Sequence, residues 1–374
     1  MSKIFVAIAM MAVLAITCSA ATSPVEVLYV AQPEGETISL LTYNVNPETA
    51  VARQVGNPIS IGSTSIDPLT IGSKHFIYVW NSTDVWTYVT NAEGAPRANP
   101  LQHLAFNFVH PVNNFVVDPN GKFSYAGLIW YDNQYNNYAS LILFTIDQST
   151  GKLTNTEQVI ANYGPSEYIP LTSFQFGSVG KKLFAKYNDD GPHTCIIGYD
   201  YYNVNQTTGS LGPQKSLFYA QADCSSAGAV AVTDFVTGAA SACCGSGSRS
   251  LNITSIANNK QMIGCEYTPA FCADQAAQLA FDPASKNIFF SDIGQNETFV
   301  GHLDFAKNEL IQGPTSIPGL PTIYFSPDSR LVYAVNTNTN DIGIYTFQSS
   351  TGDLISTTTL PDQGNVGIAT ATLP

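Results

Sequence analysis

Short stretches of alternating apolar and polar residues, separated by turns, run along most of the chain. A clear example is Ile323–Ile355, "IYFSPDSRLVYAVNTNTNDIGIYTFQSSTGDLI". Side chains of a strand alternate between two faces, and Pro, Asp, Asn and Gly favour turns, so this stretch predicts three short strands divided by two turns. Beyond the N-terminal segment, no stretch shows a sustained apolar period of 3.6 residues. The pattern therefore predicts an all-β protein.

The same phrase recurs along the chain. A closely similar stretch spans Val116–Leu153, and in both an aromatic residue follows a turn proline by six residues: Tyr333 after Pro327, and Tyr125 after Pro119. Phe289 follows Pro283 by the same interval and Phe184 follows Ser178, while Tyr78 and Tyr29 align through the second and third strands of their units. This gives six aromatic anchors: Tyr29, Tyr78, Tyr125, Phe184, Phe289 and Tyr333. They are spaced at about 50 residues, except for one interval of about two periods before Phe289. The count predicts seven units, one of them degenerate and located in the cysteine-rich segment.

Seven repeats of four strands predict a seven-bladed β-propeller with four-stranded antiparallel blades, in one domain covering residues 24–374. A single four-stranded sheet cannot bury both of its faces, whereas blades stacked around an axis bury them against each other. The first unit, which starts near Val25, is one strand short. The C-terminal segment Gly367–Thr372 has the alternation of a strand, so we expect it to complete the first blade and close the ring.

The turns predict which residues share a face of the disc. Type I-like turns such as "SPDSR" and "DPNGK" join the innermost strand to the second, and should lie on one face. Loops between the second and third strands, and loops leading into each innermost strand, should lie on the opposite face. That face surrounds the mouth of the central channel, so we expect the functional site there.

The N terminus has the organisation of a secretory signal peptide. Lys3 precedes the apolar run "IFVAIAMMAVLAI" and the small residues "TCSAATS", which predicts a signal over residues 1–21 with cleavage after Ala20 or Ala21. Cys18 raises the alternative of a lipoprotein, but the residues before it, "AIT", fit that pattern poorly. No later stretch is apolar and long enough for a transmembrane helix. We expect a secreted or periplasmic monomer.

Charge and cysteine content narrow the choice of partners. The net charge of −13 argues against nucleic acid, which requires basic patches. Six cysteines follow the signal: Cys195, Cys224, Cys243, Cys244, Cys265 and Cys272. An even number in an exported chain predicts structural disulfides. Their spacing matches no zinc pattern, and we predict neither a metal nor another cofactor.

The repeated unit resembles that of the seven-bladed lactonase-type propellers, the family that includes propeller-type 6-phosphogluconolactonase and YVTN-repeat proteins. The resemblance is clearest in Ile323–Ile355, Val116–Leu153 and Leu279–Leu310. It implies the propeller fold and a lactone hydrolase. The stretch "FVHPVNNF" also resembles the His-Pro entry to a blade in that family, which places His110 at the channel mouth.

Lactone hydrolysis needs a base to activate water and a group that stabilises the developing oxyanion. Histidine is the natural base near neutral pH, so His110 is our candidate catalytic residue. Its alternative role is structural, packed beside Pro111. Six further residues are candidates for substrate binding on the same face, although residues of these types are more often ordinary loop residues: Asp67, Glu167, Tyr168, Asp189, His193 and Asp274.

A phosphorylated lactone would call for Arg or Lys to bind the phosphate. The chain has four arginines, and Lys186 is the only basic residue that we place in a loop of the channel face. We therefore expect an unphosphorylated lactone as substrate. The alternative is a non-catalytic propeller that binds a glycan, peptide or protein through the same loops, of which "IWYDNQYNNY" is the richest in Tyr and Asn.

Overall fold

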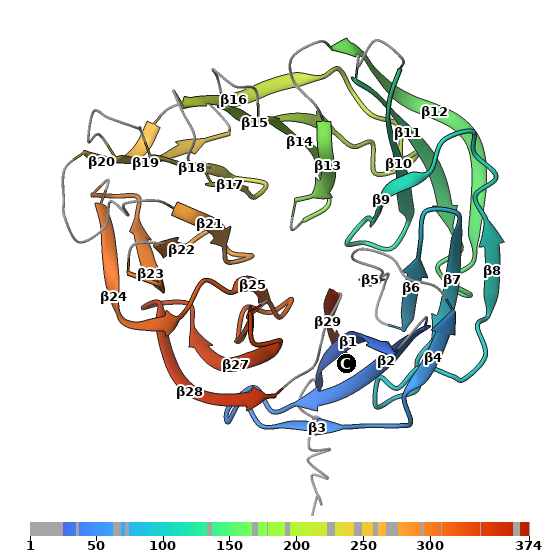
Figure 1. The fold of residues 1–374 in the computed structure, drawn as a ribbon, viewed down its shortest axis with the longest axis horizontal. Coiled ribbons are helices and arrows are strands. Elements are labelled where there is room, and N and C mark those ends of the chain that lie inside the picture. Colours follow the sequence, from blue (N-terminus) through green and yellow to red (C-terminus); the bar gives the residue numbers. More distant parts are fainter. Residues whose placement is uncertain are drawn as a thin grey trace, which may run out of the picture.

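The computed structural model describes residues 25–34, 37–62, 69–71, 75–132, 137–166, 171–177, 179–190, 195–222, 229–242, 249–256, 261–266, 276–292, 295–307, 309–336, 338–361 and 367–373. The described residues form 29 strands and no helix. The strands build separate antiparallel sheets that follow one another around a central axis (Figure 1). The protein is an all-β propeller. Within these ranges no helix could cross a membrane.

Six of the sheets have four strands each. The first contains β5 (Leu69–Ile71), β6 (Phe76–Trp80), β7 (Asp84–Val89) and β8 (Gln102–Ala105). The second contains β9 (Val112–Val117), β10 (Phe123–Tyr131), β11 (Asn137–Ile146) and β12 (Leu153–Ser166). The third contains β13 (Leu171–Phe176), β14 (Lys182–Asp190), β15 (Cys195–Asn203) and β16 (Lys215–Ala222).

The remaining four-stranded sheets continue the series. The fourth contains β17 (Ala229–Val232), β18 (Val236–Ala242), β19 (Arg249–Ser255) and β20 (Gln261–Glu266). The fifth contains β21 (Ala276–Phe281), β22 (Asn287–Asp292), β23 (Glu297–Asp304) and β24 (Glu309–Pro318). The sixth contains β25 (Thr322–Phe325), β26 (Leu331–Asn336), β27 (Asp341–Gln348) and β28 (Asp353–Leu360). In each, the first strand lies near the axis and the fourth at the rim (Figure 1).

The sheet at the chain ends differs from the others because it has five strands: β1 (Val25–Glu34), β2 (Thr37–Val45), β3 (Ala52–Gln54), β4 (Ile59–Gly62) and β29 (Gly367–Leu373). The expectation of four strands in every sheet is wrong here. β3 and β4 pair with successive halves of β2, so two short strands occupy one strand position. Gly56, with φ of 68°, lies between them. The predicted C-terminal strand is β29, which pairs antiparallel with β1 from Val25↔Leu373 to Ala31↔Gly367.

The six aromatic anchors of the repeat are all fully buried, and each lies in the strand next to the innermost one. Three of them donate a hydrogen bond to a turn glycine of the next sheet: Tyr29 to Gly94 O at 2.9 Å, Tyr78 to Gly151 O at 2.9 Å, and Tyr125 to Gly209 O at 2.8 Å. These glycines have φ of 85°, 73° and 72°, a region that side chains disfavour. The repeat in the sequence therefore reflects a repeated bond between sheets.

The cysteine-rich unit has no aromatic anchor because another residue type lies at that position. In sheet β17–β20, Thr233 N donates a hydrogen bond to Val236 O across the turn between the first two strands. The equivalent bond in sheet β9–β12 runs from Asp118 N to Phe123 O, so Val236 and Phe123 hold the same position. Two residues beyond Val236 lies Gly238, where sheet β9–β12 has Tyr125. The degenerate unit is thus a four-stranded sheet with glycine at its anchor position.

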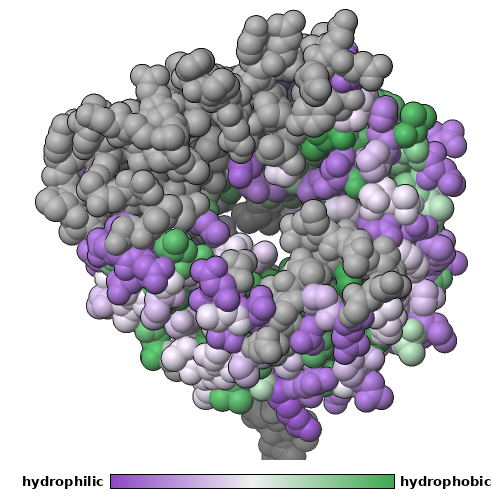
Figure 2. Space-filling model, in the orientation of Figure 1, coloured by the Kyte–Doolittle hydropathy of each residue, from purple (hydrophilic) through white to green (hydrophobic). Residues whose placement is uncertain are grey.

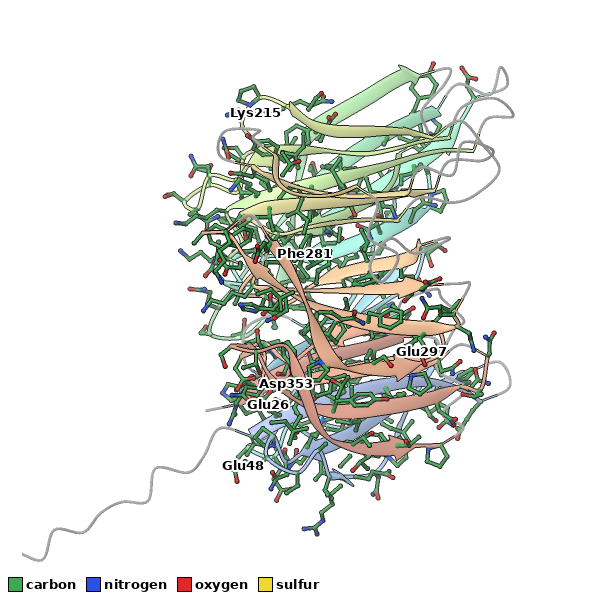
Figure 3. The ribbon with its side chains drawn as sticks, turned by 90° about the vertical axis from the view of Figure 1, so that its left-hand side faces the viewer. Glu26, Glu48, Lys215, Phe281, Glu297 and Asp353 are labelled. Carbon is green, nitrogen blue, oxygen red and sulfur yellow. The ribbon has the colours of Figure 1, made fainter. Side chains whose placement is uncertain are left out.

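The core lies between neighbouring sheets rather than at one centre. Sheets β5–β8 and β9–β12, for example, share one cluster that contains Tyr78, Trp80, Phe115, Leu128 and Phe144. Similar clusters follow between other pairs of sheets. This packing orients the strands so that their connections reach two opposite faces. Figure 3 shows Glu297, at the β22–β23 connection, at one edge, and Glu26 and Asp353 at the other.

Candidate functional site

His110 lies in the segment between β8 and β9, which leads into an innermost strand, as predicted. Two hydrogen bonds hold the ends of this segment against the β6–β7 turn. Phe106 N donates to Thr83 O at 2.7 Å, and Val112 N donates to Ser82 O at 2.9 Å. Phe106 is buried and its ring stacks on Phe108 at 5.8 Å. The residues around His110 are therefore held at both ends rather than left as an open loop.

His110 belongs to a row of three aromatic rings. Its imidazole stacks on Trp130 with centroids 4.3 Å apart and planes 6° apart. Trp130 in turn stacks on Tyr138, at 5.7 Å and 11°. The row follows the sheet register, because Trp130 pairs with Tyr138, and His110 lies two residues before Val112, the partner of Leu128. Side chains in one row of a sheet lie on the same face and contact each other.

The far end of the row carries a carboxylate. Tyr138 Oη donates to Asp132 Oδ2 at 3.2 Å. Partial desolvation, this hydrogen bond and the nearby negative charge raise the pKa of the Tyr138 phenol above its usual value. The phenol is therefore a neutral hydrogen-bond donor over the physiological pH range. We call His110, Trp130, Tyr138 and Asp132 the aromatic row.

Contacts with the core and with neighbouring strands hold the aromatic row in place. Trp130 is half-buried and packs on the cluster between sheets β5–β8 and β9–β12. Near His110, Asn113 Oδ1 accepts a hydrogen bond from Ile129 N at 2.8 Å, and Asn114 Oδ1 accepts one from Phe174 N at 3.2 Å. Val109, by contrast, is 94% exposed. The arrangement offers an imidazole on a rigid platform, next in the chain to an exposed apolar residue.

The comparisons with known proteins rest on structure alone, since no family model and no curated protein matches the sequence. A periplasmic gluconolactonase from Pseudomonas aeruginosa is 14% identical, with a TM-score of 0.60 over 94% of this chain and 100% of that one. A candidate 6-phosphogluconolactonase from Bacteroides uniformis is 14% identical, with a TM-score of 0.62 over 93% and 99%. Another, from Bacteroides fragilis, is 13% identical, with a TM-score of 0.57 over 94% and 99%. The fold is that of the 6-phosphogluconolactonase-type propellers.

Most of the other predicted site residues lie outside the described residues: Asp67, Glu167, Tyr168, His193 and Asp274. The backbone of Asp189 lies near the end of β14, paired with Ile196, next to the connection with β15. The roles of all six in substrate binding stay predictions.

The placement of Lys186 in a loop is wrong. Lys186 lies within β14, opposite Ser173 and Tyr199, and is half-buried. Burial lowers the pKa of its ammonium group below the usual value. The error arose because β14 extends to Asp190, beyond the point where the apolar pattern ends. A desolvated lysine in a strand is poorly placed to bind an anion on the channel face.

Sequence reasoning missed the roles of Trp130, Asp132 and Tyr138, although it selected the segment that contains them for its Tyr and Asn content. The missing step was the register, which brings these side chains beside His110. Sequence reasoning also missed a pairing at the rim, where His103 and Asp84 share a hydrogen bond of 2.8 Å. They are 19 positions apart in the chain.

Two of the predictions from sequence concern metal ions and disulfides. Among the described residues, no group of three or more His, Cys, Asp and Glu is close enough to hold a metal ion. The side chains of the six cysteines after the signal fall outside the described part, which contains no disulfide. The predicted disulfides therefore stay a prediction.

Proposed function

We propose that this protein is an exported lactonase-like β-propeller that hydrolyses an unphosphorylated lactone at the face where His110 lies. The observation that carries the proposal is the aromatic row, which fixes an imidazole at the entry to an innermost strand. Support for export comes from the signal-like N terminus and from the name of the P. aeruginosa neighbour, a periplasmic protein.

The proposal includes a ring of seven blades. In this arrangement the five-stranded sheet is the seventh blade, and β29 is its innermost strand. The antiparallel pairing of β29 with β1 supports this, because the two ends of the chain then share one blade and the inner edge of β1 is covered. Figure 2 shows the surface hollowed at the centre of the ring, where a small ligand could enter.

The chemistry follows from the imidazole. The unprotonated nitrogen of His110 takes a proton from water as the water oxygen bonds to the lactone carbonyl carbon. The resulting oxyanion collapses, the bond between that carbon and the ring oxygen breaks, and the imidazolium returns its proton to the ring oxygen. Atoms and charge balance, with one water consumed and a hydroxy acid released. Stacking on Trp130 holds the imidazole ring in position for both transfers.

Two described cations, Arg330 and Lys186, are poorly placed to bind a phosphate at this face. Arg330 pairs with Glu26 and Asp328, and Figure 3 shows Glu26 at the edge opposite the β22–β23 connection. Lys186 is half-buried with a lowered pKa. A phosphate is normally bound by exposed Arg or Lys. The B. uniformis neighbour is named for a phosphorylated substrate and the P. aeruginosa neighbour for an unphosphorylated one, and we propose the second kind here.

A non-catalytic propeller is the second candidate. The aromatic row supports this candidate, because aromatic rings that carry a polar group, such as Trp and Tyr, are enriched at binding interfaces. In that case ligand would bind at the same face without turnover.

The test is hydrolysis of unphosphorylated lactones by the wild type and by His110→Ala. We expect His110→Ala to lower kcat/KM by about 100-fold or more, the usual contribution of a general base. The matched control is His103→Ala, which removes a histidine that also stacks on a tryptophan but lies in an outer strand. Equal activity of His110→Ala and wild type would remove His110 from the mechanism. Tight binding of an oligosaccharide without turnover of any lactone would favour the second candidate.

A further inference from the structure

Two histidines of the chain stack on a tryptophan, and the two stacks differ in what balances the charge of a protonated imidazole. His103 stacks on Trp86 with ring centroids 5.1 Å apart and planes 7° apart, and its Nε2 also pairs with Asp84 Oδ1 at 2.8 Å. His110 stacks on Trp130 more closely, at 4.3 Å and 6°. His110 forms no hydrogen bond or ion pair with the described residues. A proton on His103 therefore meets a carboxylate, whereas a proton on His110 meets the face of an indole ring.

The face of an indole ring attracts a cation. Its quadrupole gives negative potential above and below the ring, and a cation within about 6 Å of the centroid is stabilised, more strongly where the pair is shielded from water. The His110 imidazole lies parallel to this face and well within that distance. His110 and Trp130 are both half-buried, whereas the side chain of His103 is 54% exposed. The attraction between His110 and Trp130 therefore grows when the imidazole gains a proton.

The other charged and titratable groups around this stack lie at its edges. On the far side of the indole, the Tyr138 hydroxyl donates to Asp132 Oδ2 at 3.2 Å, and the raised pKa of the phenol keeps it neutral. The β6–β7 turn, which holds both ends of the segment that carries His110, contains Asp84, and that carboxylate is engaged in the other stack. The connection at residues 133–136 has the sequence "NQYN", without an acidic residue. The indole face is thus the group in direct contact with the imidazole.

From this arrangement we infer that Trp130 stabilises the imidazolium that forms on His110 during the proposed hydrolysis, as a carboxylate does in a His–Asp pair. The inference rests on the proposed function and gives Trp130 an electrostatic role besides holding the ring. His110 takes a proton from water while the water oxygen bonds to the lactone carbonyl carbon, so positive charge develops on the imidazole in the transition state. The imidazole is neutral in the substrate complex, so the attraction is stronger in the transition state and lowers the barrier. Trp130 acts through His110 and is a positioning residue.

The experiment weakens the indole face while keeping the shape of the side chain nearly unchanged. Fluorine withdraws electrons from the ring, so the whole protein is prepared with tryptophan and with its monofluoro, difluoro and trifluoro forms. We expect kcat for hydrolysis of an unphosphorylated lactone to fall stepwise, by about fivefold over the series, while KM stays unchanged. A residue that only held the ring in place would give no such trend, since packing is preserved.

The matched control is the same series in Trp130→Phe. The chain has three tryptophans, so fluorination also alters Trp80 and Trp86. Both remain in Trp130→Phe, where kcat should no longer vary with fluorination. A fall of equal size in Trp130→Phe would assign the effect to the other tryptophans and overturn the inference.

A second measurement does not depend on turnover. A double-mutant cycle from urea unfolding of the wild type, His110→Ala, Trp130→Leu and the double variant gives the coupling between the two side chains. We expect this coupling to be stronger at pH 5, where histidine is ordinarily protonated, than at pH 8, by about three- to fivefold in the unfolding equilibrium constant. The same cycle on His103 and Trp86 should change less, because that imidazole is more exposed and has a carboxylate partner.

The two readouts separate the inference from the proposed hydrolysis. Coupling that strengthens at pH 5 without turnover of any lactone supports stabilisation of the imidazolium by Trp130 and overturns the hydrolysis. Turnover that depends on His110 but not on fluorination, with equal coupling at both pH values, overturns the inference and leaves the hydrolysis standing. Equal coupling at both pH values without turnover overturns both.

Discussion

Two kinds of junction between neighbouring sheets can be compared. At three of them a buried tyrosine donates a hydrogen bond to a turn glycine of the next sheet. At the junction between sheet β25–β28 and the chain-end sheet, Tyr333 is equally buried, but its hydroxyl has no hydrogen-bond partner among the described residues. The corresponding turn has Ala50, with φ of 58°, where the others have glycine.

Charged groups occupy this last junction instead. Glu26 is fully buried, accepts a hydrogen bond from Thr372 at 2.9 Å and pairs with Arg330 at 3.3 Å. Thr372 lies in the last strand and Arg330 in the turn immediately before β26, so one side chain links three segments of the chain. The comparison shows that two kinds of contact can join neighbouring sheets at equivalent positions: the repeated tyrosine–glycine hydrogen bond, and the single charged cluster around Glu26. They should respond differently to substitution and to pH.

The largest effect is expected at a repeated junction. A Cβ at Gly151 would lie 2.3 Å from the Phe76 ring, and the φ of 73° disfavours any side chain. Gly151→Ala should therefore lower the free energy of unfolding by about 3 kcal/mol, measured by urea denaturation. The matched control is Gly212→Ala, whose Cβ would approach nothing closer than 3.5 Å. Equal losses in the two variants would contradict the close packing at this junction.

The charged junction should make stability depend on pH. Burial of the Glu26 carboxyl, together with the nearby Asp328 charge, raises its pKa from 4.5 to about 7. The unfolded chain therefore loses this proton before the folded one, and stability falls as pH rises from about 4.5 to 7, by up to about 3 kcal/mol. Below pH 4.5 the contribution is fully present, because both states are protonated.

The group can be identified by substitution. Glu26→Gln keeps an acceptor for Thr372 and Arg330 but cannot ionise, so the fall in stability between pH 4.5 and 7 should largely disappear. The measurement is the urea midpoint at several pH values, for the wild type and the variant. An unchanged pH profile in Glu26→Gln would assign the dependence to another group.

The smallest effect compares two tyrosines directly. Tyr78→Phe removes a hydroxyl and leaves the buried Gly151 carbonyl without its donor, which should cost about 1–2 kcal/mol of unfolding free energy. Tyr333→Phe removes a buried hydroxyl that has no described partner, and should be neutral or stabilising by about 0.5 kcal/mol. Both are read from urea denaturation. A loss at Tyr333 as large as that at Tyr78 would mean that its hydroxyl has an acceptor after all.

Local patterning was sufficient for most of the strands. Alternation, turn residues and the spacing of aromatic anchors predicted four-stranded units because each unit repeats the same local geometry. The prediction failed at two places where a sheet departs from the repeated geometry. Two short strands replace a single outer strand beside β2, and β14 extends through Lys186 beyond the apparent end of its pattern. Neither departure has a local signal, since each depends on pairing with a neighbouring strand.

The site was predictable only in part. His110 was selected from a family resemblance of the stretch around it and from its position before an innermost strand, and its catalytic role stays a proposal. Trp130 and Tyr138 are 20 and 28 positions further along the chain, and only the pairing of β9, β10 and β11 places their rings beside it.

By itself, the order of apolar, polar and turn residues determined that this chain forms repeated antiparallel sheets, because each strand and turn depends on near neighbours. The tertiary structure decided which side chains meet. Contacts between sheets, such as Tyr78 with Gly151 or Glu26 with Arg330, join residues 73 and 304 positions apart. Their geometry is set by how whole sheets pack, and that packing is the sum of many weak contacts that no short stretch of sequence contains.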